Sequence, residues 1–289
     1  MSPVPEGQVR RSRVPSITHG SRRTVLRADD GVRIEALYEP SQGGGDGGND
    51  SLAIVVAHGF TGSVDRPAVR RAARVFRQYA AVITFSFRGH GGSGGRSTVG
   101  DREVLDVAAV VRWARSLGYE RVVTVGFSMG GSVVVRHAAL YRDGTDSPHE
   151  GRTEAHPAGH VSARADAVVA VSAPARWYYR GTAPMRRLHW VITRPAGRLV
   201  GRFGLRTRIH ARDWDPVPLS PVEAAARLGP TPLLVVHGDR DPYFPLDHPR
   251  ALAAAASRSE LWIVPGMGHA ENAAEETLLT RIGAWLTAA

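Results

Sequence analysis

One serine in this chain lies between a strand-like and a helix-like segment, where covalent chemistry is possible. Ser128 is the centre of GFSMG at residues 126–130, after the apolar run 122–125 and before the apolar stretch 132–140. A sharp strand-to-helix turn exposes and strains such a hydroxyl, its flanking glycines relieve crowding, and the helix amides point at a developing oxyanion. Ser128 is therefore a candidate nucleophile. The pentapeptide alone leaves open a glycine-rich helix start with a solvated serine.

Two further groups that could complete this chemistry follow other strand-like runs. Asp241 comes soon after the run 233–237, and His269 comes soon after the run 261–264. Loops at the carboxyl ends of parallel strands open on one edge of a sheet, so a base and a carboxylate there can meet a distant serine. Asp239 is an alternative acid on the first of these loops. The pattern predicts a nucleophile, a base and an orienting carboxylate at one edge.

A fourth loop could bind the negative charge that develops on a substrate oxygen. Residues 58–62 read HGFTG and follow the apolar run 52–57. We expect an oxyanion hole made of two backbone N–H groups. One belongs to Phe60 on this loop, and the other belongs to Met129, which follows the candidate nucleophile.

Length and composition favour one catalytic domain. The chain has 289 residues, 43% of them apolar, which is enough for one large core. The absence of cysteine excludes disulfides, thiolate metal sites and cysteine nucleophiles. A net charge of +10 raises nucleic acid as a partner, but all 37 basic residues are arginines, which fits a GC-rich coding bias. No zinc-finger, helix-turn-helix or aromatic RNA-binding motif is found, so we expect no nucleic-acid partner.

The apolar pattern predicts an α/β fold, with a mostly parallel central sheet and helices on both faces. We expect a disordered arm over residues 1–22 and one domain over residues 23–289. Residues 23–28 and 32–38 flank an Asp-Gly turn and predict a hairpin. The remaining strands are expected at 52–57, 81–85, 121–125, 167–171, 233–237 and 261–264, and the helices at 67–79, 101–117, 129–141, 246–256 and 271–286.

Two segments interrupt this alternation of strands and helices. Residues 143–166 are polar and predict a long exposed insertion, in which His149, His156 and His160 raise a metal site as an alternative to a solvated loop. Residues 175–228 are too long for a connecting loop and predict a cap over the carboxyl edge of the sheet.

The expected cap mixes arginines with aromatic residues. Ten arginines lie between Arg176 and Arg212, about twice the density of the whole chain. Apolar residues recur near helical spacing at Leu188, Val191, Ile192, Leu199, Val200 and Phe203, among the aromatic residues Trp177, Tyr178, Tyr179, Trp190 and Trp214. The simplest interpretation packs the apolar face on the core and leaves the arginines in solvent. An anionic acyl carrier such as a coenzyme A thioester, and a lipid surface, are alternatives.

Five motifs in order make the chain resemble the α/β-hydrolase superfamily. They are HGFTGS at 58–63, FRGHGGS at 87–93, GFSMGG at 126–131, HGDRD at 237–241 and GMGH at 266–269. The resemblance extends over about residues 23–289. It is nearest to bacterial serine esterases of the cinnamoyl-esterase and serine-aminopeptidase-like branch, and it implies an α/β-hydrolase fold with a short helical cap.

The resemblance also assigns roles to individual residues. Its chain order implies a catalytic triad of Ser128, Asp241 and His269, with the spacing after HG favouring Asp241 over Asp239. His58 and His90 would hold loops by hydrogen bonding, as their counterparts do in the family. Apart from the resemblance, we expect His237, at the end of a buried strand, to be a hydrogen-bonded core histidine.

The implied function is a serine hydrolase that cleaves a small-molecule carboxylic ester or thioester through an acyl-enzyme on Ser128, without a metal or organic cofactor. A peptidase or amidase of the same fold and a catalytically silent hydrolase-fold binding protein are the alternatives. No uninterrupted apolar run reaches roughly 18 residues, and the N-terminal segment lacks the apolar centre of a secretory signal. These features predict a cytoplasmic location, and nothing in the sequence indicates an oligomeric state.

Overall fold

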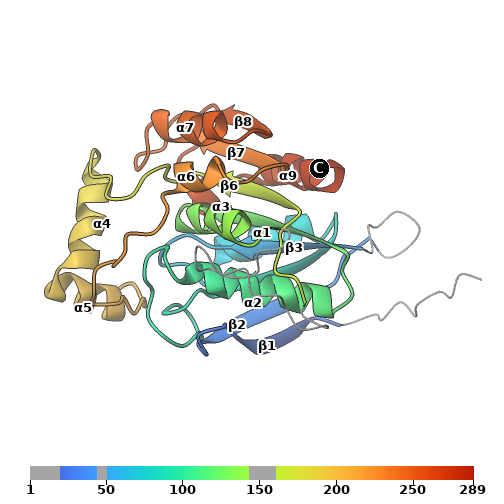
Figure 1. Ribbon diagram of the computed structural model, residues 1–289, viewed down its shortest axis with the longest axis horizontal. Helices are drawn as coiled ribbons and strands as arrows, with labels where there is room; N and C mark the ends of the chain where they lie inside the picture. The colour runs from blue at the N-terminus through green and yellow to red at the C-terminus, as the bar shows by residue number, and fades with distance from the viewer. Residues whose placement is uncertain (1–19, 44–50, 143–160) are drawn as a thin grey trace, which may run out of the picture.

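An eight-stranded sheet forms the centre of the computed structural model, which describes residues 20–43, 51–142 and 161–289 (Figure 1). Its strand order is β1-β2-β4-β3-β5-β6-β7-β8. The first two strands form the expected antiparallel hairpin, β2 pairs antiparallel with β4, and all other pairs are parallel. The strands are β1 (Arg22–Arg27), β2 (Arg33–Glu39), β3 (Leu52–Ala57), β4 (Ala81–Phe85), β5 (Arg121–Phe127), β6 (Ala167–Val171), β7 (Leu233–Gly238) and β8 (Ser259–Val264).

Two sequence predictions fall largely outside the described residues. Residues 1–19 hold most of the expected N-terminal arm, and residues 143–160 hold most of the expected insertion. His149, His156 and His160 all lie in the second of these ranges. The arm, the insertion and the histidine metal site therefore stay predictions.

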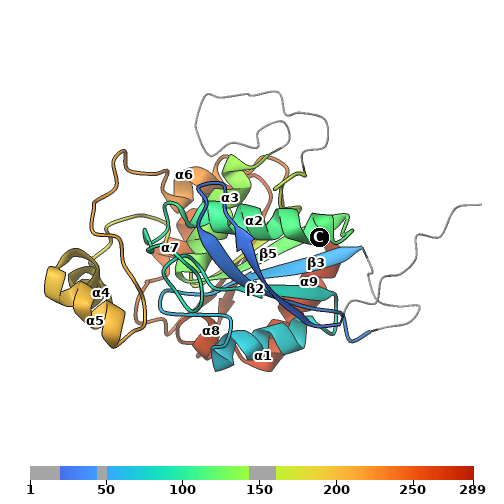
Figure 2. The ribbon, with the colours of Figure 1, turned by 90° about the horizontal axis from the view of Figure 1, so that it is seen from below.

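Helices cover both faces of the sheet, as the sequence predicts (Figures 1 and 2). One face carries α1 (Pro67–Phe76), α8 (Ala270–Ala273) and α9 (Glu276–Ala288). The other face carries α2 (Glu103–Ser116), α3 (Met129–Leu140), α6 (Pro221–Ala225) and α7 (Asp247–Ala255). Two further helices, α4 (Ala183–Thr193) and α5 (Pro195–Phe203), project from one end of the molecule as a helical hairpin, which we call the cap hairpin. The expected α/β fold class is confirmed.

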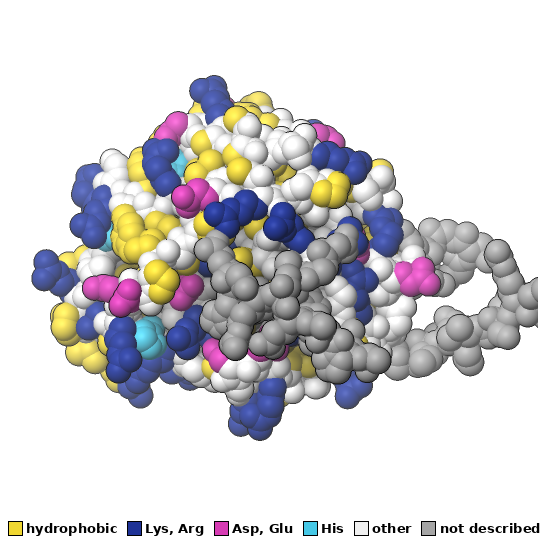
Figure 3. Space-filling model, in the orientation of Figure 1, with side chains coloured by type: hydrophobic (Ala, Val, Ile, Leu, Met, Phe, Trp, Pro, Cys, Tyr) yellow, Lys and Arg dark blue, Asp and Glu magenta, His cyan; other side chains and the backbone are white. Residues whose placement is uncertain are grey.

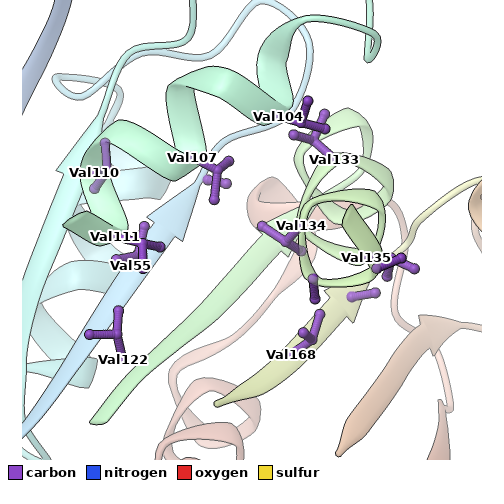
Figure 4. Close-up of a cluster of buried hydrophobic side chains, with 14 of the residues drawn as sticks. Val55, Val104, Val107, Val110, Val111, Val122, Val133, Val134, Val135 and Val168 are labelled. Carbon is purple, nitrogen blue, oxygen red and sulfur yellow. The ribbon is translucent and has the colours of Figure 1, made fainter. Parts of the chain in front are cut away.

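The core is rich in valine because the inner strands are buried on both sides. Alternate residues of a strand face opposite layers, so Val55 packs toward α2 and α3 while Ile54 packs toward α1 and α9. Figure 4 shows valines of α2 and α3 meeting those of β3, β5 and β6 in one of these layers. This packing fixes the strand ends from which the loops of the site emerge.

The expected helix over residues 271–286 is wrong, because the chain breaks it into α8 and α9. Ala274 and Glu275 have extended backbone between the two helices. One guanidinium nitrogen of Arg71, Nη2, donates to the carbonyl oxygens of Glu271 at 2.6 Å and Ala274 at 3.0 Å. These bonds satisfy carbonyls that lose helical partners at the break, which is a long-range contact that local sequence does not contain.

Strand β5 also differs from its expected bounds, since it continues past Val125 to Phe127. Its last two residues pair with β6, Gly126 opposite Ala170 and Phe127 opposite Val171. A glycine that looks like a strand breaker is thus held in the sheet by its pairing with β6.

No helix in the described part of the chain is long and apolar enough to cross a membrane.

Candidate active site

Ser128 occupies a strained turn between β5 and α3. Its φ is 51° and its ψ is −114°, a left-handed conformation that a serine adopts only when its surroundings impose it. A Cβ on Gly126 would lie 2.2 Å from the carbonyl oxygen of Gly130, and a Cβ on Gly130 would lie 2.4 Å from that of Ala57. Both glycines are therefore required by close backbone contacts, as the sequence predicts.

The structure brings together the three side chains that the sequence selected. The Nε2 atom of His269 lies 2.9 Å from the Oγ of Ser128, and its Nδ1 lies 2.7 Å from the Oδ2 of Asp241. The three residues come from loops after β5, β7 and β8, all at the carboxyl edge of the sheet. A proton on Nδ1 held by Asp241 leaves Nε2 free to accept the serine proton.

Asp241 is fully buried and is held in the ionised form. Its Oδ1 accepts the backbone N–H groups of Tyr243 at 2.8 Å and Phe244 at 3.2 Å. Burial on its own raises the pKa of Asp241, but the hydrogen bonds from His269 and from the backbone outweigh it and bring the pKa below its ordinary value. The group facing His269 is therefore a carboxylate.

The alternative acid, Asp239, faces another part of the loop. Its Oδ1 accepts the backbone N–H of Gly266 at 2.7 Å and so ties the loops after β7 and β8 together.

His237 is buried, as expected, and its Nε2 lies 2.9 Å from the carbonyl oxygen of Phe244. Its Nδ1 has no hydrogen-bond partner in the described structure, so only one of the two ring nitrogens is hydrogen-bonded as expected. Burial lowers the pKa of His237, which keeps it neutral.

Two histidines hold the oxyanion loop, in the roles that the resemblance implies. His58 accepts the backbone N–H of Phe87 on Nε2 at 3.0 Å, and its Nδ1 lies 2.6 Å from the carbonyl oxygen of Gly59. The Nε2 of His90 accepts the backbone N–H of Thr61 at 3.4 Å. Burial lowers the pKa of His58 to about 3, so its ring is neutral and can accept a hydrogen bond.

The two expected oxyanion donors belong to residues that line the cavity beside Ser128. Phe60, Ser128 and Met129 line the same cavity. Within the described residues, neither the N–H of Phe60 nor that of Met129 donates to a protein acceptor. Two unpaired N–H groups next to a nucleophile are what an oxyanion hole requires.

A buried carboxylate beside this loop escaped the sequence analysis. The Oε1 of Glu271 accepts the backbone N–H of Gly59 at 3.0 Å, and Glu271 itself is buried. Ser172 plays a similar part after β6, where its Oγ accepts the N–H of Ala270 next to His269. Tyr243 stacks against the imidazole of His269, with ring centroids 4.3 Å apart. Only the short spacings from Asp241 to Tyr243 and from His269 to Glu271 could have pointed to these residues.

The cavity above Ser128 has a volume of about 510 Å³ and lies between the sheet edge and the cap hairpin. Its cap side is a stripe of α4, namely Met185, Leu188 and Ile192, which recur at helical spacing. Two tryptophans form an aromatic wall and are fixed by their indole N–H groups: Trp177 donates to Pro218, and Trp214 donates to Thr98. The site therefore offers a mostly apolar chamber that ends at the serine.

The cap only partly follows the expected packing of one apolar face on the core. Leu188 and Ile192 do face inward, but Leu199, Val200 and Phe203 on α5 are exposed to solvent. That part of the expectation is wrong, because α5 packs on α4 through Gly197 and Gly201, which lie on its other side. No cluster of three or more metal-ligating side chains occurs among the described residues.

Comparison with known proteins identifies the fold. The profile of the alpha/beta hydrolase family matches residues 54–278, and the chain belongs to that family. No curated protein matches the sequence.

Solved structures with the same fold include several esterases and hydrolases. The esterase Pf2001 of Pyrococcus furiosus aligns with a TM-score of 0.65 at 20% identity, over 93% of this chain and 92% of that one. Est1E of Butyrivibrio proteoclasticus, solved with ferulic acid bound, has a TM-score of 0.56 at 17% identity, over 92% and 96%. A serine hydrolase without a lid from Xanthomonas campestris has a TM-score of 0.57 at 17% identity, over 93% of each chain. At these identities the likeness shows the fold alone.

Proposed function

We propose that this protein is a serine hydrolase that cleaves a carboxylic ester or thioester through an acyl-enzyme on Ser128. The observation that carries the proposal is the hydrogen-bond chain from Asp241 through His269 to Ser128, with distances of 2.7 Å and 2.9 Å. It ends in a cavity lined by Phe60 and Met129, whose backbone N–H groups have no acceptor among the described residues. A separate group is thus present for each role: nucleophile, base, orienting acid and oxyanion donors.

In the first half of the reaction, His269 Nε2 takes the proton from Ser128 Oγ as the oxygen attacks the acyl carbon. The carbonyl oxygen becomes an oxyanion, which the N–H groups of Phe60 and Met129 bind. Asp241 stabilises the imidazolium that has formed. His269 then gives its proton to the leaving alcohol or thiol, and the ester or thioester bond breaks to leave the acyl-enzyme.

In the second half, water replaces the leaving group. His269 removes a proton from the water as its oxygen attacks the acyl-enzyme, and the same two N–H groups bind the second oxyanion. Collapse of this intermediate returns the proton to Ser128 Oγ and releases the carboxylic acid. Every step is a proton transfer or an acyl transfer, so the proposal includes no metal and no organic cofactor. It retains the predicted cytoplasmic location.

The cavity supports a substrate with an apolar acyl or aryl group. The apolar side chains of α4 and the two tryptophans form part of its walls, and about 510 Å³ accommodates a medium-sized organic group. Arg176 and Arg180 also line it and are exposed. Comparing the turnover of a neutral ester with that of its coenzyme A thioester, over a range of salt concentrations, distinguishes the two substrate classes.

A fluorophosphonate probe tests for the activated serine directly. We expect a single adduct by intact mass on the wild-type protein and none on Ser128→Ala. Ser132→Ala is the matched control, since Ser132, in the first turn of α3, lines the same cavity but donates its hydroxyl to the carbonyl oxygen of Met129. An adduct that persists in Ser128→Ala, or a folded wild-type protein that forms none, contradicts the proposal.

A further inference from the structure

Positive charge is concentrated in one segment of the cap. Residues 176–212 contain ten of the 37 arginines and no acidic residue, whereas the remaining 27 arginines are matched by 27 acidic residues elsewhere. A coding bias toward arginine would not separate the two signs in this way. The excess of positive charge in residues 176–212 is therefore as large as the formal net charge of the whole chain.

The structure leaves most of these arginines without a compensating carboxylate. Within the described residues, Arg176 is the one member of the segment that forms an ion pair, with Asp247. Arg198 donates to the carbonyl oxygens of Ile192 and Thr193, and Arg208 donates to that of Ser93. Neutral carbonyls position these guanidinium groups but do not cancel their charge. The cap thus presents a positive field to solvent.

The outer side of the cap hairpin is also apolar. Gly197 and Gly201 lie four residues apart and pack one side of α5 against the rest of the cap. Leu199 and Phe203, also four residues apart, lie on its opposite side, where they are 59% and 74% exposed. Figure 3 shows arginines beside apolar side chains at the end of the molecule where α4 and α5 lie.

We call this surface the cap patch. It comprises four exposed apolar residues and four exposed arginines: Trp190, Leu199, Val200 and Phe203 with Arg187, Arg194, Arg202 and Arg206. The guanidinium of Arg202 lies 5.4 Å from the ring centroid of Phe203, so charge and apolar surface are adjacent. Single exposed apolar residues are common on proteins, but four on one projecting hairpin surrounded by unpaired arginines are not.

We propose that the cap patch docks the protein on an anionic phospholipid surface. Leucine, valine, phenylalanine and tryptophan side chains gain by entering the boundary between headgroups and acyl chains, and arginines gain from anionic headgroups around them. Nucleic acid fits less well, because bases could stack on Trp190 and Phe203 but would leave the other two exposed apolar side chains, Leu199 and Val200, without a partner. A second copy fits less well too, because two such patches would bring unpaired arginines face to face.

Docking in this way would connect the surface to the site. The opposite side of α4 lines the cavity through Met185, Leu188 and Ile192. The hairpin that touches the lipid would thus also roof the chamber above Ser128. The docking itself involves no step of the proposed hydrolysis, so the two proposals can fail separately.

Vesicle sedimentation with the full-length Ser128→Ala protein tests the docking without any lipid hydrolysis. The vesicles are phosphatidylcholine alone, or an equal mixture of phosphatidylcholine and phosphatidylglycerol. We expect binding to the mixed vesicles, little binding to phosphatidylcholine alone, and weaker binding as salt is added. Adding Leu199→Ser with Phe203→Ser, or Arg187→Gln with Arg202→Gln and Arg206→Gln, should each weaken partitioning by at least about tenfold.

A matched control comes from the edge strand β1, which contributes no residue to the cap patch. Val25 and Arg27 are exposed there, so Val25→Ser with Arg27→Gln removes similar groups from another surface and should bind vesicles normally. Thermal melting checks that each variant is folded. The proposal is overturned if mixed vesicles bind no protein, if both cap variants bind as well as the control, or if light scattering shows a dimer that the apolar variant dissociates. Binding to duplex DNA that exceeds vesicle binding and survives the apolar variant overturns it as well.

Discussion

The sheet edge at Ser128 and the cap hairpin satisfy their polar groups in opposite ways. At the sheet edge, buried side chains such as Asp241 and Glu271 receive hydrogen bonds from loops far away in sequence. In the cap hairpin, arginines and apolar side chains face solvent together. The first arrangement fixes reacting atoms and tolerates little change. The second forms the surface that we propose to dock on lipid, and single substitutions there should leave the fold intact.

The largest effect should come from the orienting acid. Asp241→Asn leaves the loop in place but favours the wrong tautomer of His269, so we expect kcat to fall by about 10⁴-fold. Asp239→Asn is the control, because an asparagine Oδ1 can still accept the N–H of Gly266. Ester hydrolysis by the two variants measures the difference. Equal activity would mean that the 2.7 Å contact of Asp241 with His269 has no catalytic role.

A smaller loss is expected at the carboxylate that holds the oxyanion loop. Glu271→Ala frees the N–H of Gly59 and lets the loop shift, which should lower kcat by about tenfold to hundredfold with little change in KM. Glu271→Gln keeps an acceptor oxygen and should restore most of the rate. Glu275→Ala, at an exposed site nearby, should be neutral. A glutamine variant as slow as the alanine variant would show that the negative charge matters, not the hydrogen bond.

Substitutions in the two regions should also differ in their effect on the free energy of unfolding. Val134 on α3 is fully buried among the valines of Figure 4, and its truncation to alanine should cost about 2 kcal/mol of unfolding free energy. Val200 on α5 is largely exposed, so Val200→Ala should change stability by less than about 0.5 kcal/mol. Urea denaturation compares them. Equal losses would mean that the cap hairpin packs more tightly than its exposure indicates.

The smallest effect per pH unit is a dependence of stability on pH that the buried region should show. The pKa of His58 is about 3 in the folded protein, below its unfolded value of 6.5, so the unfolded state takes up a proton first as pH falls. The stability it confers is complete above pH 6.5 and is lost toward pH 3, with a slope of at most about 1.4 kcal/mol per pH unit. His58→Gln should reduce that slope, as measured by denaturation at several pH values. An unchanged slope would assign the acid sensitivity to other groups.

Much of the fold follows from local patterns. Short apolar runs alternating with longer amphipathic ones predict a mostly parallel sheet, and parallel strands place their following loops on one edge. Ser128, Asp241 and His269 could therefore be selected before their distances were known. Gly126 could be interpreted in the same way, because the contact that excludes a Cβ there, with Gly130, arises within the turn, whereas Gly130 is crowded by Ala57 at the end of β3.

Other features depend on contacts that no local pattern contains. The break between α8 and α9 is stabilised by Arg71, about 200 residues earlier in the chain. Glu271 becomes part of the site only because Gly59 comes to lie beside it. The exposure of Leu199 and Phe203 follows from α5 packing through its glycines, whereas periodicity alone suggested a buried apolar face.

The sequence by itself determined the class of fold, the nucleophile turn and the three strand ends that carry a serine, a carboxylate and a histidine, because periodicity and turn chemistry are local. The strand pattern left Asp239 and Asp241, two residues apart, as alternative acids, and only the family resemblance favoured Asp241; the tertiary structure shows that it is Asp241 that meets His269. It also decided which side of the cap faces the cavity and which faces solvent. Hydrogen-bond geometry and close packing join segments distant in the chain, so these outcomes exist only once the sheet and its helices have assembled.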